Sequence, residues 1–304
     1  SIATSYNHMS IVYAGLNDCM QEIAYQQKSL DMRLEIFGEM HYNTAINYNN
    51  LGTSYGNQGN YQLAVSYHQK ALDILLQNTN KHSAIIAKNY NNLAKNNCHL
   101  NNYEQAFTYY QLALQSVCPT FSSTNFRDNP SLDNPIYPII LLNIFDYKSQ
   151  TQYQYYKNKS HQIADLSACL QTYLLADELA NRMRHSYQTE ESKLTLGNTL
   201  KQAYQYALLI FYEVAQTFKD ATLPQQITLA LQGKTPNETI WHFIEKSKTT
   251  VLLAKLTDAE AKVLGKIPAQ LLQIEKNIKA QLSYLNKTIT DQEAKPPEQQ
   301  NTEL

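Results

Sequence analysis

The sequence predicts an all-α solenoid built from stacked helix pairs, and three observations support that fold class. Residues 48–72 recur as residues 90–114, so that equivalent positions such as Leu51 and Leu93 lie 42 residues apart. Within each copy, apolar residues recur at steps of three and four, which is the period of an amphipathic helix. No stretch shows the alternation that indicates a strand. A fixed period of this size is typical of supersecondary units that stack on their neighbours.

A weaker copy of the repeat lies 42 residues earlier, where Tyr6 aligns with Tyr48, and three units therefore fill residues 1–118. Each unit predicts two helices. The expected helices are 2–14 and 18–37, then 41–57 and 61–77, then 82–99 and 103–117. Gly59-Asn60 and Asn101-Asn102 stand between the helices of units two and three. Such residues tolerate a left-handed backbone, so a tight turn is expected at both places.

The repeat stops at residue 118, and residues 119–135 contain three prolines and little periodicity. We interpret them as a loop inserted between helix pairs. Longer helices are expected at 136–157, 161–187, 190–218 and 235–256, with a short helix at 257–264 and a last one at 268–290. Residues 220–234 are a weak region around Pro224 and Gly233. The expected divisions are repeats 1–118, loop 119–135, long helical pairs 136–219, C-terminal helices 220–290 and a polar tail 291–304.

The overall composition argues against several classes of function. The formal net charge is −1, so no global field recruits nucleic acid, and we expect no direct nucleic-acid partner. No apolar run reaches the length of about 18 residues that a membrane-spanning helix needs, so no membrane partner is expected. The four cysteines lack metal-ligand spacing, which predicts no metal, no cofactor and thiols buried in a reducing, cytoplasmic setting. The chain opens in mid-repeat, which is typical of a fragment of a longer protein.

Unit two resembles the tetratricopeptide (TPR) repeat. Its matching residues are Leu51-Gly52, Tyr55, Ala64 and Ala71, with His68 at a position where an aromatic residue is usual. The 42-residue period and the phrase Asn91-Asn92-Leu93-Ala94 resemble the kinesin-light-chain type of this repeat. The resemblance implies a right-handed superhelix, followed here by longer TPR-like helix pairs, and a protein or peptide as partner.

The second half has a resemblance of its own. The phrases ADELANRMR (176–184), TEESK (189–193), WHFIEKSKTTVLLAKL (241–256) and IPAQLLQIEKNI (267–278) follow in that order. Their succession resembles the helical region that precedes the caspase-like CHAT protease domain in bacterial TPR–CHAT proteins. It implies that this segment is the sensor or partner-binding arm of a CHAT domain in cis. The alternative is a stand-alone TPR peptide or cargo adaptor without a protease.

We predict no catalytic residue in this segment, and hence no enzyme. The phrase Ser167-Ala168-Cys169 is close to the nucleophile phrase of CHAT domains. A caspase-like cysteine needs a strand end or loop and a histidine that takes its proton. Cys169 instead falls in the middle of a predicted amphipathic helix, so we interpret it as a packing residue.

The TPR resemblance places the binding groove on the concave face, which is lined by the first helix of each unit. The expected groove residues are Asn7, His8, Asn49, Asn50, Thr53, Asn57, Lys88, Asn91, Asn92 and Lys95. Asparagine both donates and accepts, so it can hold an extended peptide backbone. Lys88 and Lys95 are two helical turns apart and could together hold an acidic side chain or a C-terminal carboxylate. The alternative is that these residues are solvated faces of an asparagine-rich chain.

Overall fold

A computed structural model describes residues 2–16, 18–80, 82–133, 135–186, 190–219 and 222–257. Within those residues the secondary structure is helical and contains no strand, which confirms the all-α fold class. The short helix expected at 257–264, the last helix expected at 268–290 and the polar tail 291–304 lie outside the described residues, apart from Thr257.

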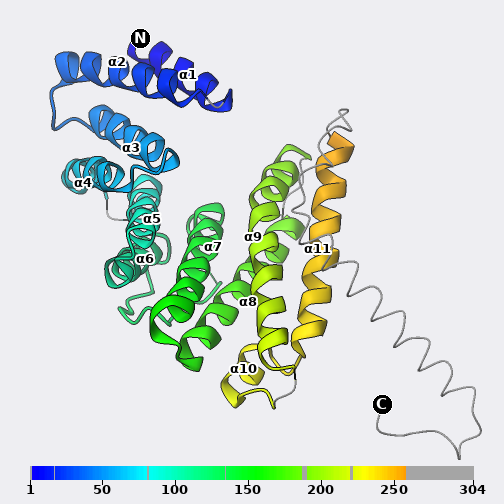
Figure 1. Ribbon diagram of the computed structural model, residues 1–304. Coiled ribbons are helices and arrows are strands. Elements are labelled where there is room, and N and C mark those ends of the chain that lie inside the picture. The colour runs from blue at the N-terminus through cyan, green and yellow to red at the C-terminus, as the bar shows by residue number, and fades with distance from the viewer. Residues whose placement is uncertain are drawn as a thin grey trace, which may run out of the picture. The chain divides into compact units, whose positions relative to one another are not determined.

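The helices follow the expected order closely (Figure 1). Their bounds are α1 Ile2–Gly15, α2 Cys19–Phe37, α3 Tyr42–Asn57, α4 Tyr61–Asn78, α5 Ala84–His99, α6 Tyr103–Val117, α7 Pro138–Tyr155, α8 Ile163–Ser186, α9 Glu190–Thr217, α10 Gln225–Ala230 and α11 Pro236–Thr257. A π-helical turn, Tyr156–Ser160, extends α7. The short helix α10 was not expected, because its six residues are too few for a periodic pattern to develop.

The helices form two compact units. Unit 1, which is larger than any one sequence repeat, contains α1 to α8 together with α10. Unit 2 contains α9 and α11. The boundaries expected at residues 118, 135, 219 and 290 stay predictions.

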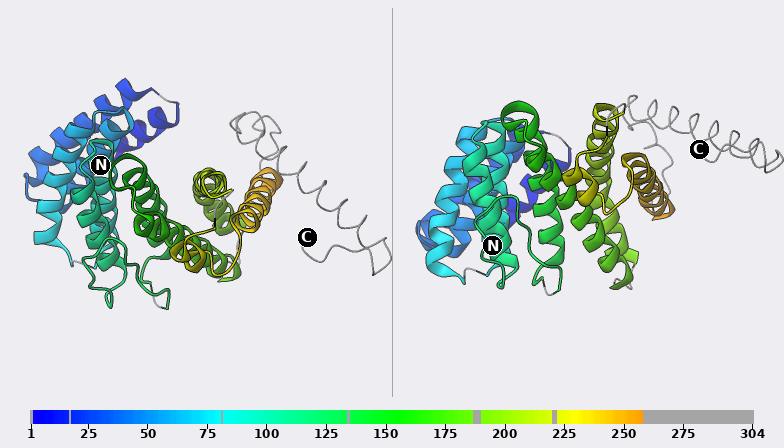
Figure 2. Two further views of the ribbon diagram at one scale, coloured as in Figure 1. Left: turned by 60° about the horizontal axis from the view of Figure 1, so that its bottom comes forward. Right: turned by 90° about the horizontal axis from the view of Figure 1, so that it is seen from below.

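Unit 1 is a stack of helix pairs, in which α1 packs with α2, α3 with α4, α5 with α6 and α7 with α8. The second helix of one pair packs on the first helix of the next pair, so α2 lies on α3, α4 on α5 and α6 on α7 (Figures 1 and 2). The pair α7 and α8 therefore continues the stack beyond the three sequence repeats.

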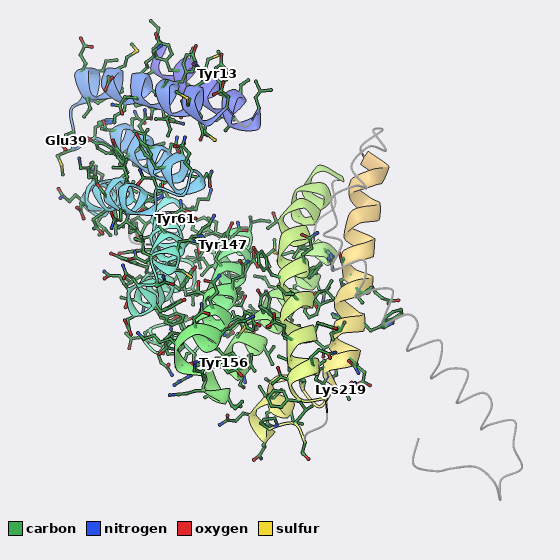
Figure 3. The ribbon with its side chains drawn as sticks, viewed as in Figure 1. Tyr13, Glu39, Tyr61, Tyr147, Tyr156 and Lys219 are labelled. Carbon is green, nitrogen blue, oxygen red and sulfur yellow. The ribbon has the colours of Figure 1, made fainter. Side chains whose placement is uncertain are left out.

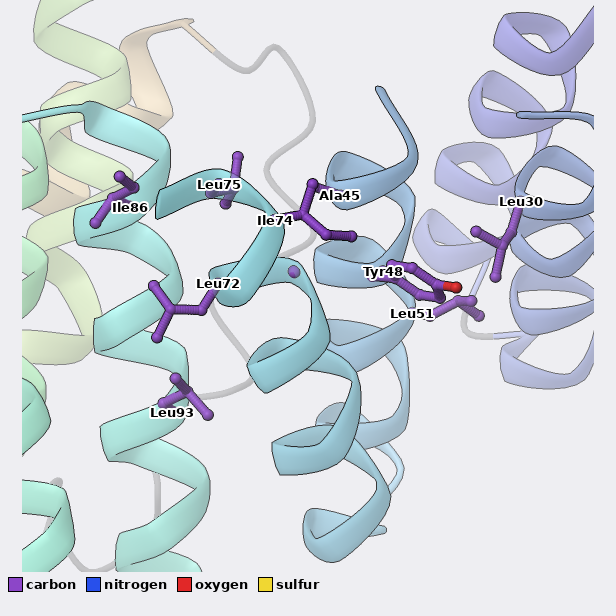
Figure 4. Close-up of a cluster of buried hydrophobic side chains, with 10 residues drawn as sticks. Leu30, Ala45, Tyr48, Leu51, Leu72, Ile74, Leu75, Ile86 and Leu93 are labelled. Atoms are coloured by element: carbon purple, nitrogen blue, oxygen red, sulfur yellow. The ribbon is translucent and has the colours of Figure 1, made fainter. Parts of the chain in front are cut away.

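The core runs without interruption from one pair to the next, as Figure 4 shows. Leu30 comes from α2, Leu51 from α3, Leu72 from α4 and Leu93 from α5, and all four are buried in one cluster. Because each pair shares its apolar side chains with its neighbours, no single pair has a complete core of its own.

Small residues set the spacing within the pairs. Ala64 and Ala71 of α4 are fully buried, as the repeat pattern implies. Gly52 of α3 lies against the ring of His68 in α4, and a Cβ at that glycine would come within 2.8 Å of the ring. The two expected tight turns are also present, since Gly59 and Asn101 have φ angles of 81° and 60°.

The loop between α6 and α7 is fastened to the stack by a buried lysine. Lys148 Nζ of α7 donates to Asp128 O at 2.6 Å, to Asn129 Oδ1 at 2.9 Å and to Gln111 Oε1 at 3.0 Å. Burial lowers the pKa of the Lys148 ammonium to about 7. Because of these hydrogen bonds, the loop is part of the packed structure of unit 1, whereas the sequence indicated only a loop inserted between helix pairs.

Unit 2 pairs α9 with α11 through aromatic contacts. The ring of Phe243 in α11 lies 5.2 Å from that of Phe211 and 5.6 Å from that of Tyr204, both in α9. All three side chains are buried. The phrase at residues 241–256 thus contributes Phe243 to a helix-packing core.

Candidate functional site: the first-helix face

One side of the first helices of unit 1 carries exposed or half-buried polar side chains, of which His8, Asn50 and Asn92 occupy equivalent positions of the repeat. We call this surface the first-helix face. It consists of His8 on α1, Asn50, Thr53 and Asn57 on α3, and Lys88, Asn92 and Lys95 on α5. The spacing of three and four residues keeps the members of each helix on one side. The structure thus places seven of the ten predicted groove residues on this side of the first helices.

Side-chain contacts join the first helices to one another. Asn50 Nδ2 on α3 donates to Asn7 Oδ1 on α1 at 2.9 Å. Asn92 Nδ2 on α5 donates to Thr53 Oγ1 on α3 at 3.4 Å. The contacts link Asn92 on α5 to Thr53 on α3, and Asn50 on α3 to the half-buried Asn7 on α1. They also use only part of the hydrogen-bonding capacity of each amide, because an asparagine side chain has two donors and an acceptor oxygen with two lone pairs.

The face extends to α7, which the sequence pattern did not indicate. Lys95 Nζ lies 4.8 Å from the centre of the Tyr147 ring, within the range of a cation–π contact. Tyr147 is labelled in Figure 3. Burial lowers the pKa of Lys95, and the negative charge of Asp146 opposes that shift. Because α7 lies beyond the repeats, only a prediction of a fourth helix pair in the same stack could have identified these residues.

Asp146 is the acidic group of this region. Burial raises the pKa of the Asp146 carboxyl to about 6, against the opposing effects of Gln150, which donates to Oδ1 at 2.9 Å, and Lys95. The positive charge of Lys95 is therefore partly balanced within the protein. Of the two lysines expected to hold a carboxylate, Lys88 is the more exposed.

Two of the predicted groove residues are not on the surface. Asn49 and Asn91 are only 8% and 6% exposed, which corrects the expectation that they line an open groove. Asn89 Nδ2 of α5 donates to Asn49 Oδ1 of α3 at 3.3 Å. Each asparagine is one residue earlier than its neighbour on the first-helix face. One residue turns the side chain by about 100° around the helix, here into the contact between successive pairs.

The structure supports packing rather than chemistry at Cys169. The side chain is fully buried in α8, and its Sγ donates to Ser149 O at 3.2 Å. Burial raises the pKa of the Cys169 thiol far above its ordinary value, which disfavours the thiolate that a nucleophile requires. Among the described residues, no group of three or more His, Cys, Asp or Glu side chains could hold a metal ion. No described helix combines the length and the apolar character needed to cross a membrane.

Two surface cavities occur elsewhere in unit 1, beside the loop. One, of about 410 Å³, includes Tyr90, Leu112 and Phe121 in its lining. The other, of about 780 Å³, lies between the loop, α8 and α10. Neither includes a residue of the first-helix face.

Among the solved structures that are similar to this chain are two of the same repeat protein. The nearly identical TPR-like repeats of a Podosopora anserina protein assigned as a kinesin light chain share 12% identity with this chain at a TM-score of 0.47, covering 81% of this chain and 96% of theirs. A point variant of the same repeats gives 13% identity, a TM-score of 0.45, and coverage of 71% and 96%.

No curated protein matches the chain in a sequence search. A family model described as "Tetratricopeptide repeat" matches residues 1–77. Proteins with this repeat are typically scaffolds without catalytic activity. Residues 1–77 are thus similar to the tetratricopeptide repeat, and repeats of this family generally mediate protein–protein interactions.

Proposed function

We propose that the first-helix face binds an extended segment of a protein partner. The observation that supports this most directly is the series of linked polar side chains on α1, α3 and α5. A partner backbone that lies across them would meet amide groups at regular intervals. Since amides donate and accept, the face would hold a backbone without requiring one particular sequence.

The lysines of the face add a preference for acidic segments. Lys88 is exposed, and Lys95 lies two helical turns further along α5. An acidic side chain or a C-terminal carboxylate of the partner would pair with Lys88 and approach Lys95. With a net charge of −1 on the chain, a protein partner suits this face better than nucleic acid.

The experiment compares a double variant of the face with a matched control. A partner is first recovered by pulldown from the source cell with the full 304-residue chain, and its affinity is measured by calorimetry. We expect Asn50→Ala with Asn92→Ala to weaken binding, while the free energy of unfolding changes by no more than about 1 kcal/mol. The control variant, Gln62→Ala with Gln77→Ala, alters two exposed amides on α4 and should bind as the wild type does.

The result can contradict the proposal in two ways. If the double variant binds normally, the first-helix face is not the contact surface. If it loses several kcal/mol of stability while its affinity is unchanged, the asparagines serve the fold through contacts such as that between Asn50 and Asn7.

At a finer level, we propose that this segment is the partner-binding arm of a bacterial, cytoplasmic TPR–CHAT protein, with the caspase-like domain in cis. Support comes from the ordered phrases between residues 176 and 278, of which 241–256 lie on α11. The alternative is an adaptor without a protease. Sequencing the encoding gene past codon 304 distinguishes them. A strand-rich region with His-Gly and Ser-Ala-Cys phrases is expected, and a stop codon shortly after Leu304 would exclude the protease.

A further inference from the structure

A pair of tyrosines recurs in each sequence repeat, one on the first helix and one on the second. The pairs are Tyr6 with Tyr25, Tyr48 with Tyr67, and Tyr90 with Tyr109, and corresponding members lie 42 residues apart. The ring centres within the pairs are 6.0, 6.1 and 6.1 Å apart, in that order. The three pairs therefore have the same spacing, and what surrounds one pair can be compared with what surrounds the others.

In the first two repeats a lysine of the second helix lies over these rings. Lys28 Nζ is 5.9 Å from the centre of the Tyr6 ring and 5.0 Å from that of Tyr25. Lys70 Nζ, 42 residues later, is 5.6 Å from the centre of the Tyr48 ring. These distances lie within the limit of about 6 Å for a cation–π contact. The ring that Tyr6 and Tyr48 provide is therefore a position at which this protein holds an ammonium group.

The third repeat lacks this lysine, because the equivalent residue is Leu112. A surface cavity of about 410 Å³ lies at this place, and both Tyr90 and Leu112 line it. We call it the Tyr90 cavity. Its volume falls within the range of about 300–1,000 Å³ that is typical of ligand sites. In the third repeat, the tyrosine ring that bears a cation elsewhere thus faces open space.

The lining of the Tyr90 cavity suits both the stem and the head of a lysine side chain. Leu76 and Phe121 supply apolar and aromatic contacts for the stem. Gln115 and Ser116 supply oxygen atoms that can accept hydrogen bonds from an ammonium group. Ser116 Oγ already donates to Leu112 O at 2.9 Å, so towards a ligand it can only accept. Among the described residues, no lysine or arginine lines the cavity and would repel a cation.

We propose that the Tyr90 cavity binds a lysine side chain of a protein partner, with its ammonium group over the Tyr90 ring. The partner's lysine takes the place that Lys28 and Lys70 have in the first two repeats. Its stem lies along Leu112, and its ammonium group donates to the oxygen atoms of the lining. The cavity shares no residue with the first-helix face, so this site is independent of the function proposed above.

The test uses the full chain and the capped peptide acetyl-Gly-Lys-Gly-amide, with binding followed by saturation-transfer NMR. We expect weak but saturable binding. Acetylation of the lysine in the peptide removes the charge and keeps the stem, so the acetylated peptide should bind at least about threefold more weakly.

A substitution that restores the lysine of the other repeats tests the location of the site. In Leu112→Lys the new ammonium group should lie over the Tyr90 ring and weaken binding of the peptide by at least about tenfold. The matched control, Gln62→Lys, adds the same charge at an exposed position on α4 and should bind the peptide as the wild type does.

A second pair of variants tests the ring itself. Tyr90→Leu removes the aromatic face, whereas Tyr90→Phe keeps it, so the phenylalanine variant should bind the peptide more tightly than the leucine variant. Circular dichroism checks that each variant is folded. If one of them does not fold, the comparison of Leu112→Lys with Gln62→Lys decides.

Four results would overturn the proposal. The first is an absence of saturable binding. The second is equal binding of the two peptides, because the cavity would then accept any apolar stem. The third is wild-type affinity in folded Leu112→Lys. The fourth is binding that appears only in Lys81→Ala, because a lysine of this chain, next in sequence to His82 of the lining, would then be the occupant.

Discussion

His68 should make the stability of unit 1 depend on pH in a way that can be traced to one side chain. Its imidazole is fully buried between α3 and α4, and neither ring nitrogen has a hydrogen-bond partner among the described residues. Burial lowers the pKa of His68 from 6.5 to about 3. The folded protein therefore holds the neutral ring, whereas the unfolded chain binds a proton below pH 6.5.

The sign of the effect follows from that difference. The contribution of the neutral ring to stability is complete above pH 6.5 and is lost as the pH falls towards about 3. With about 1.4 kcal/mol for each pH unit, the loss between pH 7 and pH 5 is about 2 kcal/mol. Asp146 acts in the opposite direction, because its raised pKa stabilises the folded state as the pH falls through about 6. That contribution is common to all His68 variants and cancels in a comparison.

The assay measures urea unfolding by far-UV circular dichroism at pH 7 and pH 5, for the wild type and for His68→Leu. Leucine has a similar volume and does not titrate, so the variant should lose about 2 kcal/mol less than the wild type over this interval. An equal pH dependence in both proteins would refute the reasoning. An imidazole resonance of His68 that titrates near pH 6.5 in the folded protein would refute it as well.

Three further predictions concern packing. Gly52→Ala should destabilise the protein relative to Gly15→Ala, because the new Cβ lies 2.8 Å from a buried ring at the first site and meets no atom within 4 Å at the second. Overpacking costs about 1–3 kcal/mol, and equal thermal stability of the two variants would contradict this. Lys148→Met should cost about 1–3 kcal/mol and speed amide exchange in residues 119–133, since it leaves three acceptors without their donor. Unchanged exchange would show that the loop is held by other contacts. Iodoacetamide should label Cys169 far more slowly in the folded protein than in urea, whereas rapid labelling would contradict its burial.

The helices themselves could be predicted well from the sequence. The helix expected at 61–77 is observed as Tyr61–Asn78, and the helix expected at 103–117 as Tyr103–Val117. The left-handed turns at Gly59 and Asn101 could be predicted equally well from the sequence. All of these depend on neighbours within a few residues along the chain, so periodicity and turn chemistry suffice to locate them.

The candidate site was predictable only in part. The sequence placed Asn50 and Asn92 on the first helices, and the structure links both to side chains of the preceding first helix. Sequence reasoning could not separate Asn49 from Asn50. Adjacent residues differ by about 100° around the helix axis, and which of them is buried depends on where the next helix pair lies.

What the sequence determined by itself is the all-α class, the 42-residue repeat and the polar character of the first helices. Only the tertiary structure decided that Asn49 and Asn91 are buried, that Lys148 fastens the loop, and that Tyr147 meets Lys95. The physical reason is that helix formation is governed by local hydrogen bonds and spacing. Burial and partnership are decided by contacts between distant residues, 40 positions apart for Asn49 with Asn89 and 52 for Lys95 with Tyr147, and one helical period carries no information about them.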